Sequence, residues 1–171
     1  LCDIGTGSGC IALSVLRGFG KKLKVLATDI SEEALSIANQ NNFKLRFSYP
    51  ASSLCEFKCM DRLTGNSQQF HVITSNPPYI KENNDKELVH QQVMSFEPHL
   101  ALFLKDSEYN DWFKQLFTDV YAALYDQGVF LMEGHEHHLE ELEQIAKELN
   151  WNETKILKDY CDRNRFLILR K

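Results

Sequence analysis

A glycine-rich segment near the beginning of the chain limits the possible folds more than any other feature. Residues 3–9 read D-I-G-T-G-S-G and lie between an apolar run of strand length and the helix-periodic segment I-A-L-S-V-L. Gly5, Gly7 and Gly9 allow positive φ angles and a close approach of the backbone to a ligand. A strand, a glycine turn and a helix in this order predict a ligand site at the helix N-terminus, although a sharp turn without a ligand has the same pattern.

Apolar runs of strand length alternate with helix-periodic segments in the first half of the chain. The runs at residues 24–30 and 72–75 are typical of buried strands, and residues 56–60 form a weaker third candidate. Ser31 followed by two glutamates predicts the N-cap of a helix that extends to about Asn42. This alternation predicts βαβ units, and therefore a parallel sheet with helices on both faces.

The second half of the chain continues with elements of both kinds. We expect a short helix over residues 86–93, a long helix that Ser107 caps, a strand over residues 128–133 and a helix over residues 139–149. Two C-terminal apolar runs flank the polar D-R-N at residues 162–164, and this spacing predicts a hairpin that places the last strand antiparallel in the sheet. Earlier in the chain, after the strand at residues 72–75, residues 79–105 are expected to form an insertion over the strand ends.

The size and charge of the chain exclude some classes of protein. Its 171 residues favour one domain with a single core. No apolar run approaches the roughly 18 residues of a membrane span, so we expect no membrane association. The formal net charge is -5 and the sequence has no block of Lys and Arg, which argues against nucleic acid as the main partner.

Five cysteines and a group of histidines bear on redox state and metals. The cysteine number is odd and no C-x-x-C spacing occurs, so neither a disulfide framework nor a zinc ribbon fits, and we expect a reducing, cytoplasmic setting. His135, His137 and His138 match no standard zinc motif and start a predicted helix, so we expect no metal. The chain opens at Leu1 and enters the glycine loop directly, so we also expect that preceding residues are missing.

Acidic residues at strand ends indicate the kind of ligand. The glycine spacing G-x-G-x-G differs from the dinucleotide fingerprint G-x-G-x-x-G, and Asp3 would repel a pyrophosphate but suits an ammonium group. Asp29 follows the second strand, where a carboxylate can accept both hydroxyls of a ribose, although a plain capping role remains an alternative. Asp61 follows the weaker third strand and could face an adenine amino group, an assignment that stays open.

The strand at residues 72–75 ends on the unusual sequence S-N-P-P-Y. In a sheet that reverses strand order at its first strand, this segment emerges beside the glycine loop. Each proline removes a backbone donor and makes the preceding residue extended, so Asn76 and the carbonyl of Pro77 form a stiff edge rich in acceptors. A planar NH2 group fits this edge, because it needs two acceptors and can stack on Tyr79. A plain strand terminator remains the alternative.

These motifs together resemble a known class of enzyme. D-I-G-T-G-S-G, T-D-I and S-N-P-P-Y-I resemble the class I S-adenosylmethionine-dependent methyltransferases that act on amino groups. E-P-H-L-A-L at residues 97–102 and D-Y-C-D-R-N-R-F at residues 159–166 further resemble the release-factor glutamine methyltransferases, the HemK/PrmC family. The resemblance implies a Rossmann-like, mostly parallel seven-stranded sheet with an antiparallel C-terminal strand and helices on both faces.

The resemblance also implies an activity. It is the S-adenosyl-L-methionine-dependent methylation of the side-chain amide nitrogen of the glutamine in the Gly-Gly-Gln motif of peptide chain release factors, by a protein-(glutamine-N5) methyltransferase. Residues 1–171 would be its catalytic domain, truncated at the N-terminus and without the helical substrate-recognition domain that is usual in the family. We expect a monomer that meets nucleic acid only through a ribosome-associated substrate.

Residue roles follow by position. Asn76, Pro77 and Tyr79 are implied as catalytic. The residues implied in cofactor binding are Asp3, Gly5, Thr6, Gly7, Asp29, Asp61 and Asn76. The residues implied in substrate binding are Asn76, Pro77, Pro78, Tyr79, Glu97 and Pro98.

Two other readings compete with this one. The N-P-P-Y geometry also serves exocyclic amines of bases, so an amino-methyltransferase for DNA adenine or rRNA guanine is the rival enzyme; the acidic balance and the lack of a basic, aromatic-rich face argue against it. A binding module that has lost catalysis is the second, and the intact acceptor segment argues against it.

Overall fold

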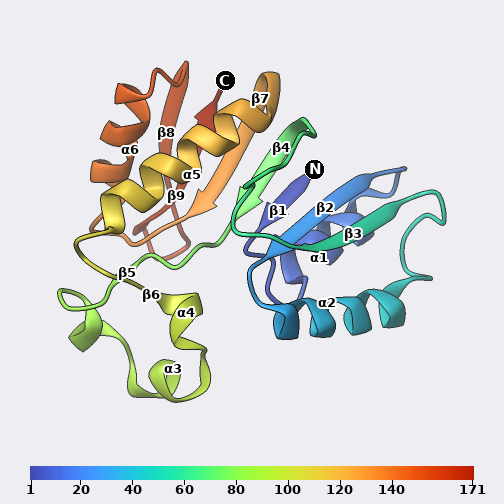
Figure 1. The fold of residues 1–171 in the computed structure, drawn as a ribbon, viewed down its shortest axis with the longest axis horizontal. Helices are drawn as coiled ribbons and strands as arrows, with labels where there is room; N and C mark the ends of the chain where they lie inside the picture. The colour runs from blue at the N-terminus through green and yellow to red at the C-terminus, as the bar shows by residue number, and fades with distance from the viewer.

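The computed structural model describes all residues 1–171 and contains a seven-stranded sheet of order β3-β2-β1-β4-β7-β9-β8 (Figure 1). Its strands are β1 (Cys2–Ile4), β2 (Lys24–Asp29), β3 (Leu54–Cys59), β4 (Phe70–Ser75), β7 (Leu124–Glu133), β8 (Glu153–Lys158) and β9 (Asn164–Arg170). A separate parallel pair consists of β5 (Ile80–Lys81) and β6 (Phe103–Leu104). The helices are α1 (Cys10–Phe19), α2 (Glu32–Leu45), η1 (Lys86–Leu88), α3 (Gln91–Phe96), α4 (His99–Leu102), α5 (Tyr109–Ala123) and α6 (Leu139–Glu148).

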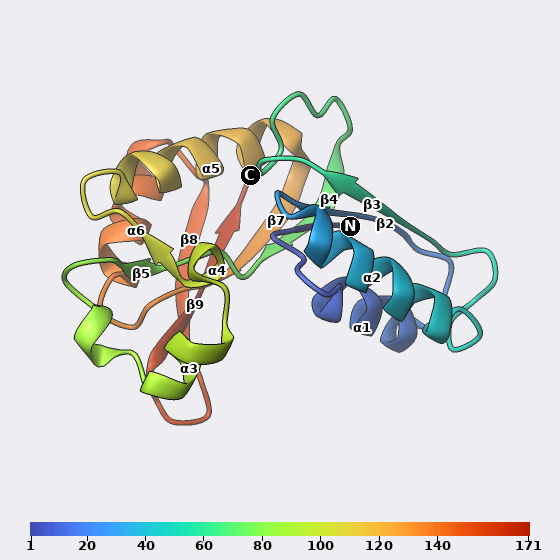
Figure 2. The same cartoon turned by 60° about the horizontal axis from the view of Figure 1, so that its bottom comes forward.

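The strand order confirms the predicted parallel sheet with a reversal at β1. The strands β1, β2 and β3 step in one direction while β4 and β7 step in the other, all parallel. Right-handed crossovers in opposite directions place their helices on opposite faces. Figure 2 shows this arrangement, with α1 and α2 on one face of the sheet and α5 on the other.

The C-terminal hairpin also agrees with the sequence. β9 pairs antiparallel with β7, for example Leu131 with Ile168, and β8 pairs antiparallel with β9. Inserting the last strand antiparallel lets a short connection return the chain to the sheet without a further crossover helix.

The main core lies between the sheet and the α5–α6 layer. Phe113 and Phe117 of α5 are fully buried and lie near Phe130 of β7, with a ring distance of 6.3 Å between Phe117 and Phe130. The apolar stripe that the sequence shows on this helix is therefore core. A smaller cluster around Leu13 and Leu16 attaches α1 to the other face.

Of the two helix caps that the sequence predicts, one is confirmed and one is wrong. Ser31 caps α2 as predicted, since its hydroxyl accepts the N–H of Ala34 at 3.1 Å, although the helix continues to Leu45 rather than ending near Asn42. The cap predicted at Ser107 is wrong: Glu108 occupies the N-cap position of α5, and no side-chain hydrogen bond caps it.

The single helix predicted over residues 86–93 is also wrong. The 3-10 helix η1 ends at Leu88, because the following Val89 is extended with φ -82° and ψ 125°, and α3 starts separately after His90. The ring of His90 accepts the N–H of Gln92 at 3.3 Å, so a local side-chain bond begins the second helix and interrupts the first.

Two strands differ from their predicted bounds. β3 lies over Leu54–Cys59 rather than residues 56–60, and β7 begins at Leu124, four residues early. The register of β7 with β4 shifts between Phe70 and Val72, so the first part of β7 lies outside the regular ladder. None of the helices is long and apolar enough to span a membrane.

Candidate active site

The glycine loop lies at the carboxyl edge of the sheet, between β1 and α1. Gly5 and Gly7 have φ angles of 66° and 56°, which residues with a Cβ adopt only with strain. A Cβ added to Gly5 would lie 3.9 Å from the backbone oxygen of Asn76, and nothing lies within 4 Å of one added to Gly7. The loop therefore runs close to the S-N-P-P-Y segment and leaves open space above Gly7.

Asp3 supports this loop from below. Its carboxylate is fully buried and accepts hydrogen bonds from Thr6 Oγ1 at 2.7 Å and from Thr74 Oγ1 at 2.8 Å. Burial raises the pKa of Asp3, and the two hydroxyl donors partly offset this effect. With no exposed surface, Asp3 orients Thr6 and joins the loop to β4 instead of presenting its charge to a ligand.

Asp29 stands at the end of β2, beside the loop. Its Oδ2 accepts the N–H of Gly7 at 2.8 Å and its Oδ1 accepts the N–H of Ser31 at 2.9 Å. The side chain is half-buried, and each oxygen keeps a second lone pair. Asp29 thus combines a structural role, holding the glycine loop against α2, with acceptor capacity toward the open side.

Asp61 lies farther along the same edge. The N–H of Met60 donates to the backbone oxygen of Asp29 at 2.9 Å, which brings the end of β3 beside the end of β2. The Asp61 side chain is 47% exposed and makes an ion pair with Arg62 at 2.8 Å. It therefore borders the site with part of its carboxylate facing solvent.

The S-N-P-P-Y segment leaves β4 next to the glycine loop. Ser75 is buried and donates its hydroxyl to the oxygen of Ile4 at 2.9 Å, which anchors the end of β4 to β1. Asn76 is exposed, Pro77 is buried, and Pro78 and Tyr79 are half-buried. This leaves the Asn76 amide free at the edge while the prolines carry the chain away from the sheet.

Tyr79 is fixed at both ends. Its hydroxyl donates to Glu133 Oε1 at 3.0 Å, and its backbone oxygen accepts from the hydroxyl of Tyr109 at 3.2 Å. Burial, followed by the nearby Glu133 charge, raises the pKa of Tyr79 to about 12, so the phenol is neutral and acts as a donor. The ring thereby forms a fixed wall beside the prolines.

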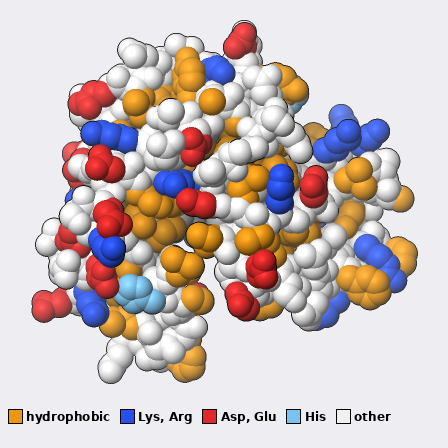
Figure 3. Space-filling view, in the orientation of Figure 1, with side chains coloured by type: hydrophobic (Ala, Val, Ile, Leu, Met, Phe, Trp, Pro, Cys, Tyr) orange, Lys and Arg blue, Asp and Glu red, His pale blue; other side chains and the backbone are white.

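Glu97 and Pro98 lie apart from these residues, on the insertion. Both are exposed, Glu97 at the end of α3 and Pro98 at the start of α4. Figure 3 shows the surface hollowed between the insertion and the α1–α2 side, below the carboxyl ends of β1 and β4. Neither Glu97 nor Pro98 makes a hydrogen bond to the S-N-P-P-Y segment.

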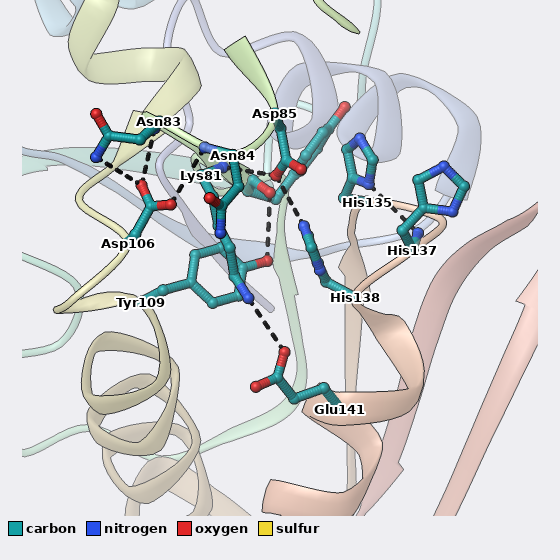
Figure 4. A network of polar contacts seen from close by, with 11 residues as sticks. Lys81, Asn83, Asn84, Asp85, Asp106, Tyr109, His135, His137, His138 and Glu141 are labelled. Atoms are coloured by element: carbon teal, nitrogen blue, oxygen red, sulfur yellow. Dashed lines mark hydrogen bonds and ion pairs between the residues drawn. The ribbon is translucent and has the colours of Figure 1, made fainter. Parts of the chain in front are cut away.

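A polar network attaches the insertion to α5 and α6 (Figure 4). Asp85 is 5% exposed; its Oδ2 accepts the N–H of Lys81 at 2.9 Å and lies 2.7 Å from His138 Nε2. Lys81 Nζ lies 3.2 Å from Glu141 Oε2 and 4.7 Å from the centre of the Tyr109 ring. The segment that directly follows Tyr79 is therefore held against the second layer of helices.

The sequence did not indicate two parts of this arrangement. Glu133 ends β7 at the same edge as Asp29 ends β2, so a polar residue after a buried strand was an available signal. No signal in the sequence indicated the pairing of Asp85 with His138, because the two residues are 53 positions apart. His138 stacks with His135 at 5.0 Å, and no group of three or more His, Cys, Asp or Glu side chains has a geometry that could hold a metal.

The strand order and the glycine loop at the carboxyl edge of the sheet define a class I methyltransferase architecture. A methyltransferase crystal structure from Pyrococcus furiosus matches 99% of this chain and 73% of its own chain with a TM-score of 0.68 and 20% identity, a likeness of fold. The chain belongs to the methyltransferase small domain family, whose model matches residues 1–102.

Similar proteins of known name indicate which methyltransferases this chain resembles. The release factor glutamine methyltransferase of Koribacter versatilis is 36% identical over 171 residues, covering 99% of this chain and 57% of the relative. The protein of the same name from Flavobacterium psychrophilum is 28% identical over 169 residues, covering 98% and 56%. The chain thus spans a little over half the length of these relatives, and the predicted resemblance to this family is confirmed.

Proposed function

We propose that this chain is the catalytic domain of a protein-(glutamine-N5) methyltransferase. Its substrate would be the side-chain amide of the glutamine in the Gly-Gly-Gln motif of peptide chain release factors. The observation that carries the proposal is the closeness of the S-N-P-P-Y segment to the glycine loop. The backbone carbonyl oxygen of Asn76 lies 3.9 Å from a Cβ built on Gly5. The names of the relatives support the choice of glutamine over a nucleic-acid base.

The residues at the edge fit S-adenosyl-L-methionine. The space above Gly7 admits a ligand against the backbone, and Asp29 retains lone pairs that a ribose diol would use. Asp61 would lie toward the base and Asn76 toward the reacting end, with Gly5, Thr6 and Asp3 forming and supporting the cradle. When bound, the cofactor supplies a methyl group on a sulfonium, which is an electrophilic carbon.

The acceptor edge would prepare the amide nitrogen for attack. The side-chain oxygen of Asn76 and the carbonyl of Pro77 would accept the two amide N–H groups, and Tyr79 would stack against the amide plane. An amide nitrogen is a poor nucleophile because its lone pair is delocalised. The orientation of the amide and its two hydrogen-bond acceptors would therefore have to raise the rate of methyl transfer. Asn76 and Pro77 would hold the nitrogen toward the sulfonium methyl that the cofactor supplies, and after methyl transfer one N–H proton would leave to water.

The remaining predictions belong to the same proposal. Pro78 keeps the edge rigid, and Glu97 and Pro98 would meet the release factor from the insertion. We propose a monomer that works in the cytoplasm, where release factors act, and touches nucleic acid only through a ribosome-associated substrate.

A labelling experiment tests the proposal. The protein is incubated with methyl-labelled S-adenosyl-L-methionine and one of four substrates in separate reactions. These are a release factor, the same release factor with the Gly-Gly-Gln glutamine changed to alanine, DNA, and rRNA. We expect label in the unmodified release factor alone. Label in nucleic acid, or equal label in the glutamine-to-alanine protein, would contradict the glutamine assignment.

A further inference from the structure

Glu133 is a polar side chain in the acceptor region that the proposed chemistry does not use. It is the last residue of β7 and is half-buried. Ser75 pairs with Met132 in the β4–β7 register, so Asn76, directly after the end of β4, follows beside Glu133, the last residue of β7. A carboxylate therefore stands at the acceptor edge, on a strand adjacent to the one that delivers Asn76.

The strands hold Glu133 rigidly. Its backbone pairs with Phe166 of β9, and the N–H of the following Gly134 donates to the oxygen of Arg165 at 2.9 Å. A Cβ added to Gly134 would come within 2.6 Å of Leu139, so the chain turns tightly into α6 directly after Glu133. A group placed on such a paired strand end is more exactly located than one on a loop.

The hydroxyl of Tyr79 is influenced by two charged groups. It donates to Glu133 Oε1 at 3.0 Å, and the nearby positive charge of Arg165 partly offsets the rise that burial and Glu133 cause in its pKa. Arg165 is itself oriented by Asp159, with 3.5 Å between Nε and Oδ2. The D-Y-C-D-R-N-R-F segment that contributed to the family resemblance therefore reaches the acceptor region through this arginine.

We propose that Glu133 is a positioning residue that sets the orientation of the Tyr79 ring, on which the acceptor amide stacks. This inference rests on the proposed function, because it assigns Glu133 a part in the same site. The Tyr109 bond fixes the backbone of Tyr79, and the Glu133 bond fixes the far end of the ring. Without the second bond the ring turns about its side-chain torsions, and a shift of about 1 Å at a reacting group lowers rates by up to roughly 100-fold.

A double-mutant cycle separates this role from general damage. Glu133→Ala and Tyr79→Phe should each lower kcat for methylation by about 10- to 100-fold, with the affinity for S-adenosyl-L-methionine unchanged. The double variant should be no slower than the slower single variant, because both changes remove one hydrogen bond. Multiplying losses in the double variant, or no loss in Glu133→Ala, would overturn the proposal.

Conservative and control variants sharpen the cycle. Glu133→Gln keeps an oxygen that accepts the Tyr79 hydroxyl and should recover most of the lost kcat. Glu153→Ala removes a 60% exposed glutamate from β8, at the far edge of the same sheet, and should leave kcat unchanged. A Gln variant as slow as the Ala variant would mean that the hydrogen bond is not what matters.

A chemical readout makes the inference independent of activity. Tetranitromethane reacts with tyrosine as the phenolate, and burial together with the Glu133 charge holds the pKa of Tyr79 at about 12. Site-resolved mass spectrometry should show faster nitration of Tyr79 in Glu133→Ala, with unchanged nitration of the fully exposed Tyr160. Equal Tyr79 nitration in both proteins would overturn the proposed contact.

The two readouts distinguish the inference from the function on which it rests. If the wild-type protein methylates no release factor, the proposed function fails, while nitration still decides whether Glu133 holds Tyr79. If the wild-type protein is active and the Glu133 variants keep full activity, the positioning role fails and the proposed function stands.

Discussion

At the scale of single residues, this site is built from side chains that combine a structural bond with a free face. Asp29 holds the N–H of Gly7 and Ser31 and keeps lone pairs toward the open side. Tyr79 is held at its hydroxyl and its carbonyl and offers its ring. Preorganisation of this kind lowers the reorganisation that a bound substrate would otherwise require.

Asn76 differs because its amide group is exposed and makes no bond that the fold needs. Asn76→Ala should therefore keep the fold and cofactor affinity while lowering kcat for methylation by about 100-fold, since one polar partner of the reacting nitrogen is removed. Calorimetry with S-adenosyl-L-methionine and steady-state kinetics check both parts. The matched control Asn152→Ala changes an exposed asparagine before β8 and should alter neither; parallel loss of binding and transfer in Asn76→Ala would contradict the assignment.

Gly7 allows backbone strain to be separated from ligand contact. Gly7→Ala places a Cβ at φ 56°, which lowers the free energy of unfolding by about 1–2 kcal/mol, and fills the space proposed for the cofactor. Gly20→Ala has the same strain at φ 67° with equally open space, at the end of α1. Thermal unfolding should show similar losses for both variants, whereas only Gly7→Ala should weaken S-adenosyl-L-methionine binding. Equal affinity in the two variants would remove Gly7 from the site.

At the scale of elements, the insertion between β5 and β6 is attached through few strong contacts. All residues of α3 and α4 except Leu102 are exposed, so little apolar burial holds them. Asp85 supplies a buried polar attachment through Lys81 and His138, and Asp106 accepts the N–H groups of Asn83 and Asn84. The orientation of the segment that follows Tyr79 therefore depends in part on one buried carboxylate.

This attachment should depend on pH. Burial alone would raise the pKa of Asp85, but the His138 and Lys81 hydrogen bonds outweigh burial, and the pKa lies below its ordinary value. A lowered pKa in the folded protein means that the carboxylate stabilises fully above about pH 4, the unfolded value, and that this contribution is lost as pH falls through the folded pKa.

Asp85→Asn tests the attachment. At neutral pH it should destabilise the insertion by about 1–3 kcal/mol, seen as faster amide hydrogen exchange across residues 81–106, and the difference from wild type should shrink in acid. Asp162→Asn, which alters an 86% exposed carboxylate paired with Lys158, should change exchange little at any pH. A difference that stays constant into acid would contradict the role of the charge.

At the scale of the whole molecule, one sheet connects the two ends of the chain, since β1 lies inside it between β2 and β4 and β9 pairs with β7. The largest core cluster draws residues from β1, β4, β7, β9, α5 and α6. Cooperative unfolding of the sheet and both helix layers is the expected consequence.

Phe117→Ala should show this cooperativity. The side chain is fully buried between α5 and β7, so its removal should lower the free energy of unfolding by about 3–5 kcal/mol without changing the steepness of the denaturant transition. Phe47→Ala, at an 86% exposed phenylalanine after α2, should cost less than about 0.5 kcal/mol. A shallower or two-step transition in Phe117→Ala would show that the layers unfold separately.

Much of the fold was predictable because it depends on local and periodic signals. The glycine loop, the Ser31 cap and the alternation of strands and helices each follow from torsional freedom, a hydrogen bond within three residues, or side-chain periodicity. The antiparallel last strand followed from the short polar connection between two apolar runs. The errors fell where two local options compete, as at His90, which starts a separate helix, and at Ser107, which does not cap α5.

The sequence by itself determined the alternation of strands and helices, the glycine turn and a proline-stiffened S-N-P-P-Y segment at the end of β4, because proline, glycine and hydrophobic spacing act on the backbone near themselves. Only the tertiary structure decided that Asp3 lies beneath the loop, that Tyr79 meets Glu133 across 54 positions, and that Asp85 meets His138 across 53. The physical reason is that these contacts depend on which strand ends and helix faces become neighbours when the sheet assembles, and no spacing along the chain encodes a meeting of two specific side chains over that distance.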